Sequence, residues 1–145
     1  MAFAGAANAY NPNRLLRHHP EQHRHQLRPD PLIDSTGKLA FVVKPSGAGS
    51  RVVHSVTVND GAWHHVAASV GAAGLKLYLD GELVATAATT SAANFTAYWR
   101  VGGNNLAGYT ARPSSDHLTG TVDEVAVYHR QLTDNEVKVH NLART

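Results

Sequence analysis

The stretch from Asn59 to Val137 is dominated by short runs in which apolar and polar residues alternate, each bounded by turn residues. This period of two is typical of antiparallel strands that bury one face. One run carries Asp80-Gly81 between LYL and ELVAT. Both residues tolerate positive φ, so the pair predicts a two-residue type I′ hairpin turn. The pattern therefore restricts the chain to an all-β fold built from hairpins.

Seven segments match the strand pattern, and one segment near the end matches a helix. The predicted strands cover residues 38–44, 51–58, 63–70, 75–80, 82–86, 98–102 and 121–128. The predicted helix follows Thr133, because Glu136 three residues later completes a capping box. Asp134 adds a favourable charge at the positive end of the helix dipole. The chain is therefore expected to fold as β-strands closed by a short C-terminal helix.

Composition excludes several classes of protein. The 145 residues, 43% of them hydrophobic, suit one domain with a core. A net charge of only +2 does not indicate a nucleic-acid surface. The absence of cysteine excludes a disulfide framework and a thiolate metal site. No apolar run approaches the length of a membrane span, so membrane insertion is not expected.

The first 35 residues differ from the rest. Residues 1–35 lack periodicity and carry a cluster rich in His, Arg and Pro, so they are expected to be poorly ordered. The cluster contains His18, His19, His23 and His25, for which adventitious metal affinity is expected rather than a structural site. An alternative is that a stretch from about Arg17 to Asp30 is aberrant, translated out of frame, which the nucleotide sequence would decide. Residues 36–145 form the predicted folded domain.

The order of the motifs in residues 36–145 resembles a known family. The motifs are W-H-H-V, L-K-L-Y-L-D-G-E-L-V, Y-W-R-V-G-G, G-T-V-D-E-V-A-V-Y and L-T-x-x-E-V. They resemble the C-terminal part of a laminin G-like, concanavalin A-like jelly-roll domain of large secreted bacterial proteins. The resemblance implies a sandwich of two antiparallel sheets, usually extracellular and often calcium-bound. The strands present are too few for both inner faces, so the jelly roll is expected to be incomplete on its N-terminal side, as part of a larger protein with neighbouring domains.

The segment 98–116 is the predicted ligand surface. Aromatic faces and side-chain amides, carboxylates and guanidinium groups on a rim loop are suited to recognising sugars. The candidate residues are Trp99, Arg100, Asn104, Asn105, Tyr109 and Asp116. The simpler alternative is that Tyr98 or Trp99 fills the core and that an ordinary loop follows.

Asp123 is the predicted metal ligand. In a strand, Asp123 and Glu124 point to opposite faces, which would place Asp123 on the side of Val125 and Val127, facing inward or towards the end of the sheet. An inward carboxylate needs a partner. Related domains bind a structural calcium ion near a sheet edge, and calcium prefers oxygen ligands. A salt bridge or turn hydrogen bonds are the alternative.

No pattern predicts catalysis. Glucanases of this fold class use alternating acids in the form E-x-D-x-E, which the chain lacks, as it lacks G-x-S-x-G, a P-loop and H-E-x-x-H. No catalytic residue is therefore expected. The leading hypothesis is a non-catalytic extracellular or cell-surface module that binds a glycan or cell-surface polysaccharide. The alternatives are a structural or adhesion module that contacts proteins, and a truncated fragment without independent function.

Overall fold

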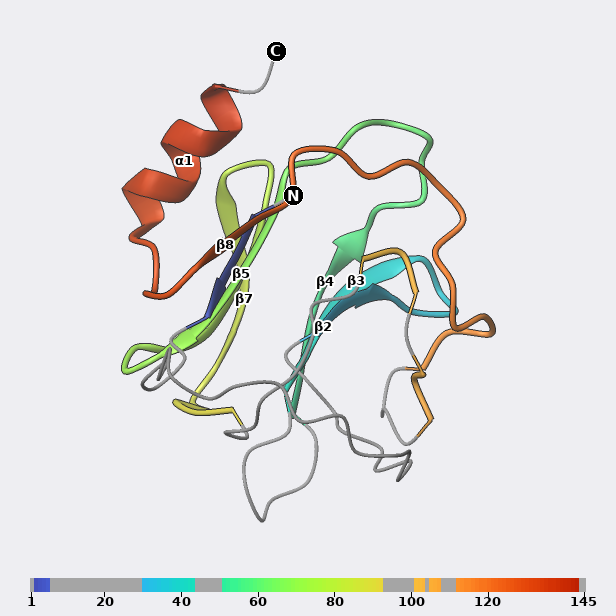
Figure 1. The fold of residues 1–145 in the computed structure, drawn as a ribbon, viewed down its shortest axis with the longest axis horizontal. Helices are drawn as coiled ribbons and strands as arrows, with labels where there is room; N and C mark the ends of the chain where they lie inside the picture. The colour runs from blue at the N-terminus through green and yellow to red at the C-terminus, as the bar shows by residue number, and fades with distance from the viewer. Residues whose placement is uncertain are drawn as a thin grey trace, which may run out of the picture.

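The structure is a computed structural model that describes residues 2–5, 30–43, 51–92, 101–103, 105–107 and 112–143. Figure 1 shows two facing sheets with a helix on the outer side of one of them. The strands are β1 (Ala2–Gly5), β2 (Asp30–Ile33), β3 (Lys38–Val43), β4 (Arg51–Thr57), β5 (Val66–Gly71), β6 (Gly74–Leu79), β7 (Glu82–Ala87) and β8 (Ala126–Tyr128). The helix α1 covers Asp134–Leu142.

The predicted two-sheet sandwich is confirmed. The larger sheet has the strand order β7-β6-β5-β1-β8, and the smaller sheet has the order β2-β3-β4. Consecutive strands β2–β3, β3–β4, β5–β6 and β6–β7 pair antiparallel, and the β6–β7 pair is the hairpin predicted from Asp80-Gly81. The exception is β1, which lies parallel to both β5 and β8. The β1 strand thereby joins two strands that are far apart in the sequence.

Alternate side chains of both sheets fill the space between them. The inner cluster consists of Leu39, Phe41 and Val43 from β3, Val66, Ala68 and Val70 from β5, and Leu75, Leu77 and Leu79 from β6. Each set recurs at every second position, as strand geometry requires when one face is buried. This shared core holds the two sheets in a fixed position and so determines where their connecting loops lie.

The outer faces of the central strands are covered as well. Helix α1 packs Val137 and the preceding Leu132 against Ala67 and Tyr78 on the larger sheet. On the smaller sheet, Leu106 covers Ala40 and Val42. Double coverage explains why nearly every residue of β3, β5 and β6 is buried. No helix among the described residues is long and apolar enough to cross a membrane.

The local predictions with a clear chemical signal are confirmed. Asp80 and Gly81 adopt φ angles of 50° and 83°, so the predicted hairpin turn has its two left-handed residues. Thr133 and Glu136 form the predicted capping box at the start of α1. In addition, the Tyr78 hydroxyl donates a hydrogen bond of 2.7 Å to Asp134 Oδ1, which attaches the first turn of the helix to β6.

Three predicted boundaries differ from the structure. The predicted strand 121–128 is reduced to β8, since only its last three residues have a paired neighbour in β1. The strand predicted to begin at Trp63 begins at Val66. Residues 1–35, predicted to be poorly ordered, contain β1 and β2. The boundary before residue 36 therefore divides the β2–β3 hairpin, in which Ile33 pairs with Leu39. Of the predicted strand 98–102, the first three residues lie outside the described part of the chain.

Candidate binding surface

The loop that joins β4 to β5, residues 58–65, is a compact turn rather than an open connection. Asp60 Oδ1 accepts a hydrogen bond of 2.9 Å from the backbone N–H of Ala62, which makes an Asx-type turn. Gly61 within this turn has a φ of 82°, a conformation that glycine adopts at little cost. At the start of the loop, the Val58 N–H donates to the carbonyl of Gly37 at 2.8 Å. The sequence Asn59-Asp60-Gly61 thus fixes the first half of the loop.

Asp80 fixes the second half of the same loop. Its Oδ1 accepts a hydrogen bond of 2.9 Å from the His65 N–H, and its own N–H donates to the His65 carbonyl at 2.8 Å. Its carbonyl accepts a further bond of 3.0 Å from Asn141 Nδ2 of α1. Asp80 therefore links three elements: the β6–β7 turn, the loop 58–65, which is called the rim loop below, and helix α1.

His64 lies between two carboxylates. Its Nδ1 is 2.8 Å from Asp80 Oδ2, and its Nε2 is 3.1 Å from Asp60 Oδ1. The hydrogen bond to Asp80 is the largest cause of a raised pKa of the His64 imidazole, and the bond to Asp60 adds to it. His64 thereby connects the two halves of the loop through its ring.

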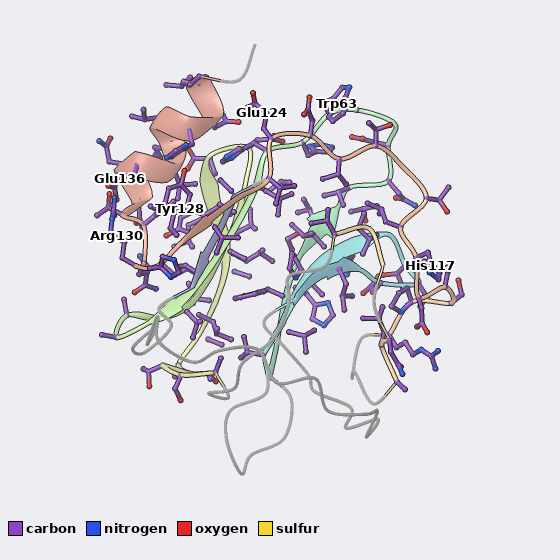
Figure 2. The ribbon with its side chains drawn as sticks, viewed as in Figure 1. Trp63, His117, Glu124, Tyr128, Arg130 and Glu136 are labelled. Carbon is purple, nitrogen blue, oxygen red and sulfur yellow. The ribbon has the colours of Figure 1, made fainter. Side chains whose placement is uncertain are left out.

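Trp63 projects from this anchored loop, and 64% of its surface is exposed. Figure 2 shows it at one end of the sandwich, where the connecting segments cross between the sheets. A tryptophan combines a large apolar face with one N–H donor, and such side chains are enriched where proteins bind partners. The sequence pattern placed Trp63 inside a strand and so missed it. Its signal in the sequence is an aromatic residue two positions after the turn residues Asn59-Asp60-Gly61.

The predicted ligand loop is closed at its base. Gly103 forms an isolated antiparallel bridge with His117, and the Leu118 N–H donates to the Gly102 carbonyl at 2.8 Å. Leu106, inside the loop, is buried against the smaller sheet. The described parts of this loop therefore pack on the outer face of the sheet that does not carry α1.

Only two of the six predicted ligand residues are within the described part of the chain. Asn105 Oδ1 accepts a hydrogen bond of 3.0 Å from the Ala107 N–H. Asp116 pairs with Arg112 at 3.1 Å. Both side chains contribute hydrogen bonds or ion pairs to the loop itself. The other four, Trp99, Arg100, Asn104 and Tyr109, lie outside the described residues.

Of the two expected placements of Asp123, inward or towards the end of the sheet, the inward one is wrong. Residues 121–125 do not form a strand, so the alternation used to orient the side chain does not apply. Asp123 is exposed, and its Oδ1 accepts a hydrogen bond of 2.8 Å from the Glu124 N–H. Within the described ranges, no group of three or more His, Cys, Asp or Glu side chains could hold a metal ion.

Calcium binding at Asp123 stays a prediction that needs oxygen ligands from further residues. If the ion binds the folded state, calcium chloride should raise the melting temperature relative to EDTA by mass action. Asp123→Asn should abolish that difference, whereas Asp116→Asn should leave it unchanged. A thermal melt of the three proteins in both buffers measures this, and equal melting temperatures for the unmodified protein would remove the prediction.

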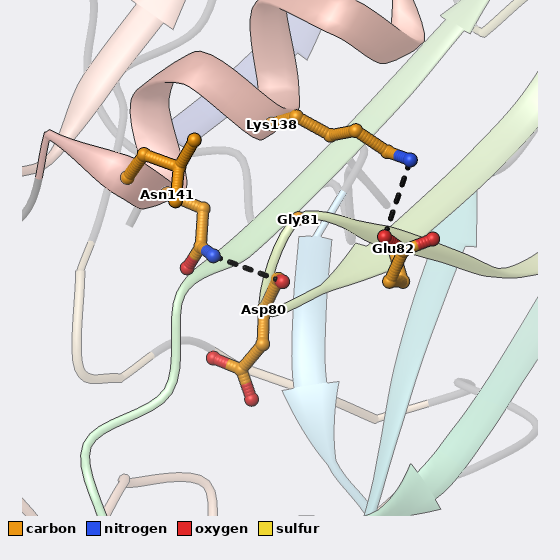
Figure 3. A pocket seen from close by; sticks show the side chains of 6 residues that line it. Asp80, Gly81, Glu82, Lys138 and Asn141 are labelled. Carbon is orange, nitrogen blue, oxygen red and sulfur yellow. Dashed lines mark hydrogen bonds and ion pairs between the residues drawn. The ribbon is translucent and has the colours of Figure 1, made fainter.

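A small hollow lies where the β6–β7 turn meets α1 (Figure 3). Its volume is about 170 Å³. Lys138 of the helix pairs with Glu82 of the strand at 3.2 Å across it. It is lined by Asp80, Gly81, Glu82, Lys138, Asn141 and Leu142. The Lys138–Glu82 ion pair and the Asn141–Asp80 hydrogen bond join α1 to the β6–β7 hairpin at this hollow. The ion pair is exposed, so it adds little stability.

Two facing sheets with a helix on one outer face and anchored connecting loops define a β-sandwich of the concanavalin A-like, jelly-roll type. The chain belongs to the concanavalin A-like lectin/glucanases superfamily, whose family model matches residues 19–138. This confirms the resemblance seen in the sequence motifs, and the match also includes residues 19–35.

A similar solved structure is that of an S-layer domain-containing protein (residues 221–444) from Clostridium thermocellum ATCC 27405. It is 21% identical, with a TM-score of 0.49, and the match covers 94% of this chain and 71% of that one. No curated protein matches the chain.

Proposed function

We propose that this chain is a non-catalytic module that binds carbohydrate, and that it works outside the cell or at its surface as part of a larger protein. The superfamily includes lectins and glucanases, so the fold is compatible with sugar recognition. The observation that carries the proposal is Trp63, a largely exposed tryptophan on a loop whose two ends are hydrogen-bonded to the body of the sandwich.

The chemistry around Trp63 suits a sugar. The exposed indole face can pack against the C–H groups of a pyranose ring. Asp60, three residues earlier, keeps 56% of its side chain exposed, so its carboxylate can accept hydrogen bonds from sugar hydroxyls. Because the loop is already ordered, little conformational entropy is lost when a ligand binds.

The rim loop is an outward-facing surface, which is suited to one stretch of a polysaccharide. Polar groups on a projecting loop are typical of binding functions carried by a rigid scaffold. The predicted loop 98–116 remains part of the proposal as a second contact surface, through the residues named above. A glycan held only at the rim would extend into solvent on both sides, as chains in a cell-wall polysaccharide do.

Trp63→Ala should weaken binding to the strongest ligand on a glycan array by about tenfold or more, the loss expected for an aromatic anchor. Because the side chain is mostly exposed, the free energy of unfolding should change by less than about 1 kcal/mol. Array binding followed by calorimetric titration measures the first quantity, and urea denaturation measures the second.

Leu142→Ala is the matched control, because Leu142 is also an exposed apolar side chain but lies at the end of α1. It should leave glycan binding unchanged. Equal affinity of the Trp63→Ala protein and the unmodified protein would contradict the assignment of this surface. A folded, cooperative protein that binds no glycan at all would contradict carbohydrate binding itself.

The second candidate function is adhesion to another protein. It is favoured by Val139 and Leu142, two exposed apolar side chains three positions apart on α1. Proteins use exposed apolar side chains of this kind in contacts with partners. A folded protein that binds no glycan, but whose partner contact is lost in a Val139→Lys variant, would support adhesion over sugar binding.

A further inference from the structure

The imidazole ring of His64 lies between the carboxylates of Asp60 and Asp80, so the contacts that it makes depend on whether the ring is protonated. Its two ring nitrogens contact carboxylate oxygens at 2.8 Å, on Asp80, and at 3.1 Å, on Asp60. Asp60 belongs to the same loop, and Asp80 belongs to the β6–β7 turn packed against it. These two carboxylates are the charged groups that raise the pKa of the His64 imidazole.

Both contacts can be hydrogen bonds only when the imidazole is protonated. An ionised carboxylate accepts hydrogen bonds and donates none, and a neutral imidazole has a single N–H. When His64 loses its proton, one of the two short contacts therefore becomes a lone pair facing a carboxylate. That contact turns from attractive to repulsive while the other survives.

The geometry indicates which contact is lost. Each carboxylate also accepts one backbone N–H, Asp80 from His65 and Asp60 from Ala62, but the bond from the ring to Asp80 is the shorter one. The Asp60 side chain is more exposed, and the contact from its carboxylate to the ring is longer. Neutral His64 therefore keeps its proton on Nδ1, toward Asp80, and releases Asp60.

We propose that His64 is a proton-operated clamp, which fixes Asp60 and the rim loop around Trp63 when it is protonated and frees them when it is neutral. Trp63 directly precedes His64, and Asp60 makes the turn that leads to Trp63. The contact between Asp60 and His64 therefore joins the two ends of the segment 60–64, which carries Trp63. If the chain binds carbohydrate as proposed above, the clamp makes glycan binding at Trp63 stronger as the pH falls.

The direction of the pH effect follows from the shifted pKa. The folded state raises the pKa of His64 above its usual value of 6.5. Protonated His64 therefore stabilises the folded state. This stabilisation is complete at pH values below the pKa of His64 in the unfolded chain, and it is lost as the pH rises through the pKa in the folded state. The clamp is therefore closed at and below about pH 6.5 and opens over the pH range above it.

The clamp itself is tested without any ligand, by NMR on the full chain. The ring nitrogens of His64 should titrate with a midpoint above 6.5, and the backbone N–H of Ala62 and the indole N–H of Trp63 should shift with the same midpoint. His64→Gln should remove this transition from both rim signals. His54→Gln is the control and should leave the transition in place, because His54 lies on β4 and its ring is 3.5 Å from Asp34 in the β2–β3 turn, away from the 58–65 loop.

Asp60→Asn gives a second test in case His64→Gln fails to fold. It removes one carboxylate from an exposed position, so the midpoint of His64 should fall toward its usual value. A midpoint at or below 6.5 in the unmodified protein, or rim signals that do not follow His64, would overturn the clamp.

The link to binding is tested by reading a neutral glycan array at pH 6 and pH 9. Signals of the unmodified protein should fall several-fold at the higher pH, whereas those of His64→Gln should be equal at both. Equal signals of the unmodified protein at both values would overturn the regulation. An array that is blank at both values would overturn the proposed function alone, because the NMR titration still decides whether the clamp exists.

Discussion

Leu77→Ala should lower the free energy of unfolding by about 3–4 kcal/mol, within the range seen when a fully buried leucine is truncated. Leu77 is 0% exposed on the inner face of β6. Side chains of β3 and β5 surround it in the cluster between the sheets. Because backbone hydrogen bonds fix the strands on either side, the sheets cannot collapse to fill the space, so the cost includes a cavity as well as lost apolar burial.

The same substitution at Leu142, which is 81% exposed, is the control and should change the free energy of unfolding by less than about 0.5 kcal/mol. Urea denaturation of both variants, followed by far-UV circular dichroism, measures the two values under one set of conditions. Comparable losses at the two positions would contradict a core between two sheets at Leu77.

The rim loop depends on this core for its position. Val66 at the start of β5 and Leu79 at the end of β6 are both part of the inner cluster, and they pair with each other across the sheet. They directly flank His65 and Asp80, the residues that anchor the loop. The side chains that present Trp63 are therefore held by the same packing that holds the sheets together, which makes the rim a preorganised surface.

Elements with a local signal could be predicted from the sequence. The strands β3 and β6 follow from the alternation of apolar and polar residues within each segment. The turn between β6 and β7 follows from the Asp80-Gly81 pair alone. The capping box before α1 is equally local. The strand pairings that follow from short hairpins were correct for the same reason.

Elements that depend on distant residues could not be predicted in this way. The segment Ala2–Gly5 is too short to show periodicity, and its parallel position between β5 and β8 depends on residues more than sixty positions away. Residues 121–125 alternate like a strand but do not belong to either described sheet, so alternation alone was misleading.

The candidate site shows the same division between local and distant information. Asp80 was recognisable as a turn residue, but its bonds to His64 and His65 span 16 and 15 positions. Only the fold brings these residues together. The exposure of Trp63 depends on the same contacts. The aromatic, amide and carboxylate residues of the segment 98–116 are visible in the sequence itself, which is why that segment was predicted as the ligand surface instead.

Gly74→Ala should lower the free energy of unfolding by about 3 kcal/mol or more, through two effects that add. Gly74 has a φ of 87°, where a residue with a Cβ is strained. A Cβ at this position would also overlap the carbonyl oxygen of Ala87 on β7. This neighbour is backbone and cannot rotate away, so β6 and β7 would have to move apart at the edge of the larger sheet.

Gly61→Ala separates the two effects, because Gly61 has nearly the same φ, 82°, and a Cβ there would meet no atom within 4 Å. It should cost only the conformational strain, about 1 kcal/mol. The difference between the two variants in urea denaturation therefore measures the steric overlap at the β6–β7 edge. Equal losses would mean that the strand edge yields freely, and β7 would then be a loosely attached strand rather than a fixed wall of the sandwich.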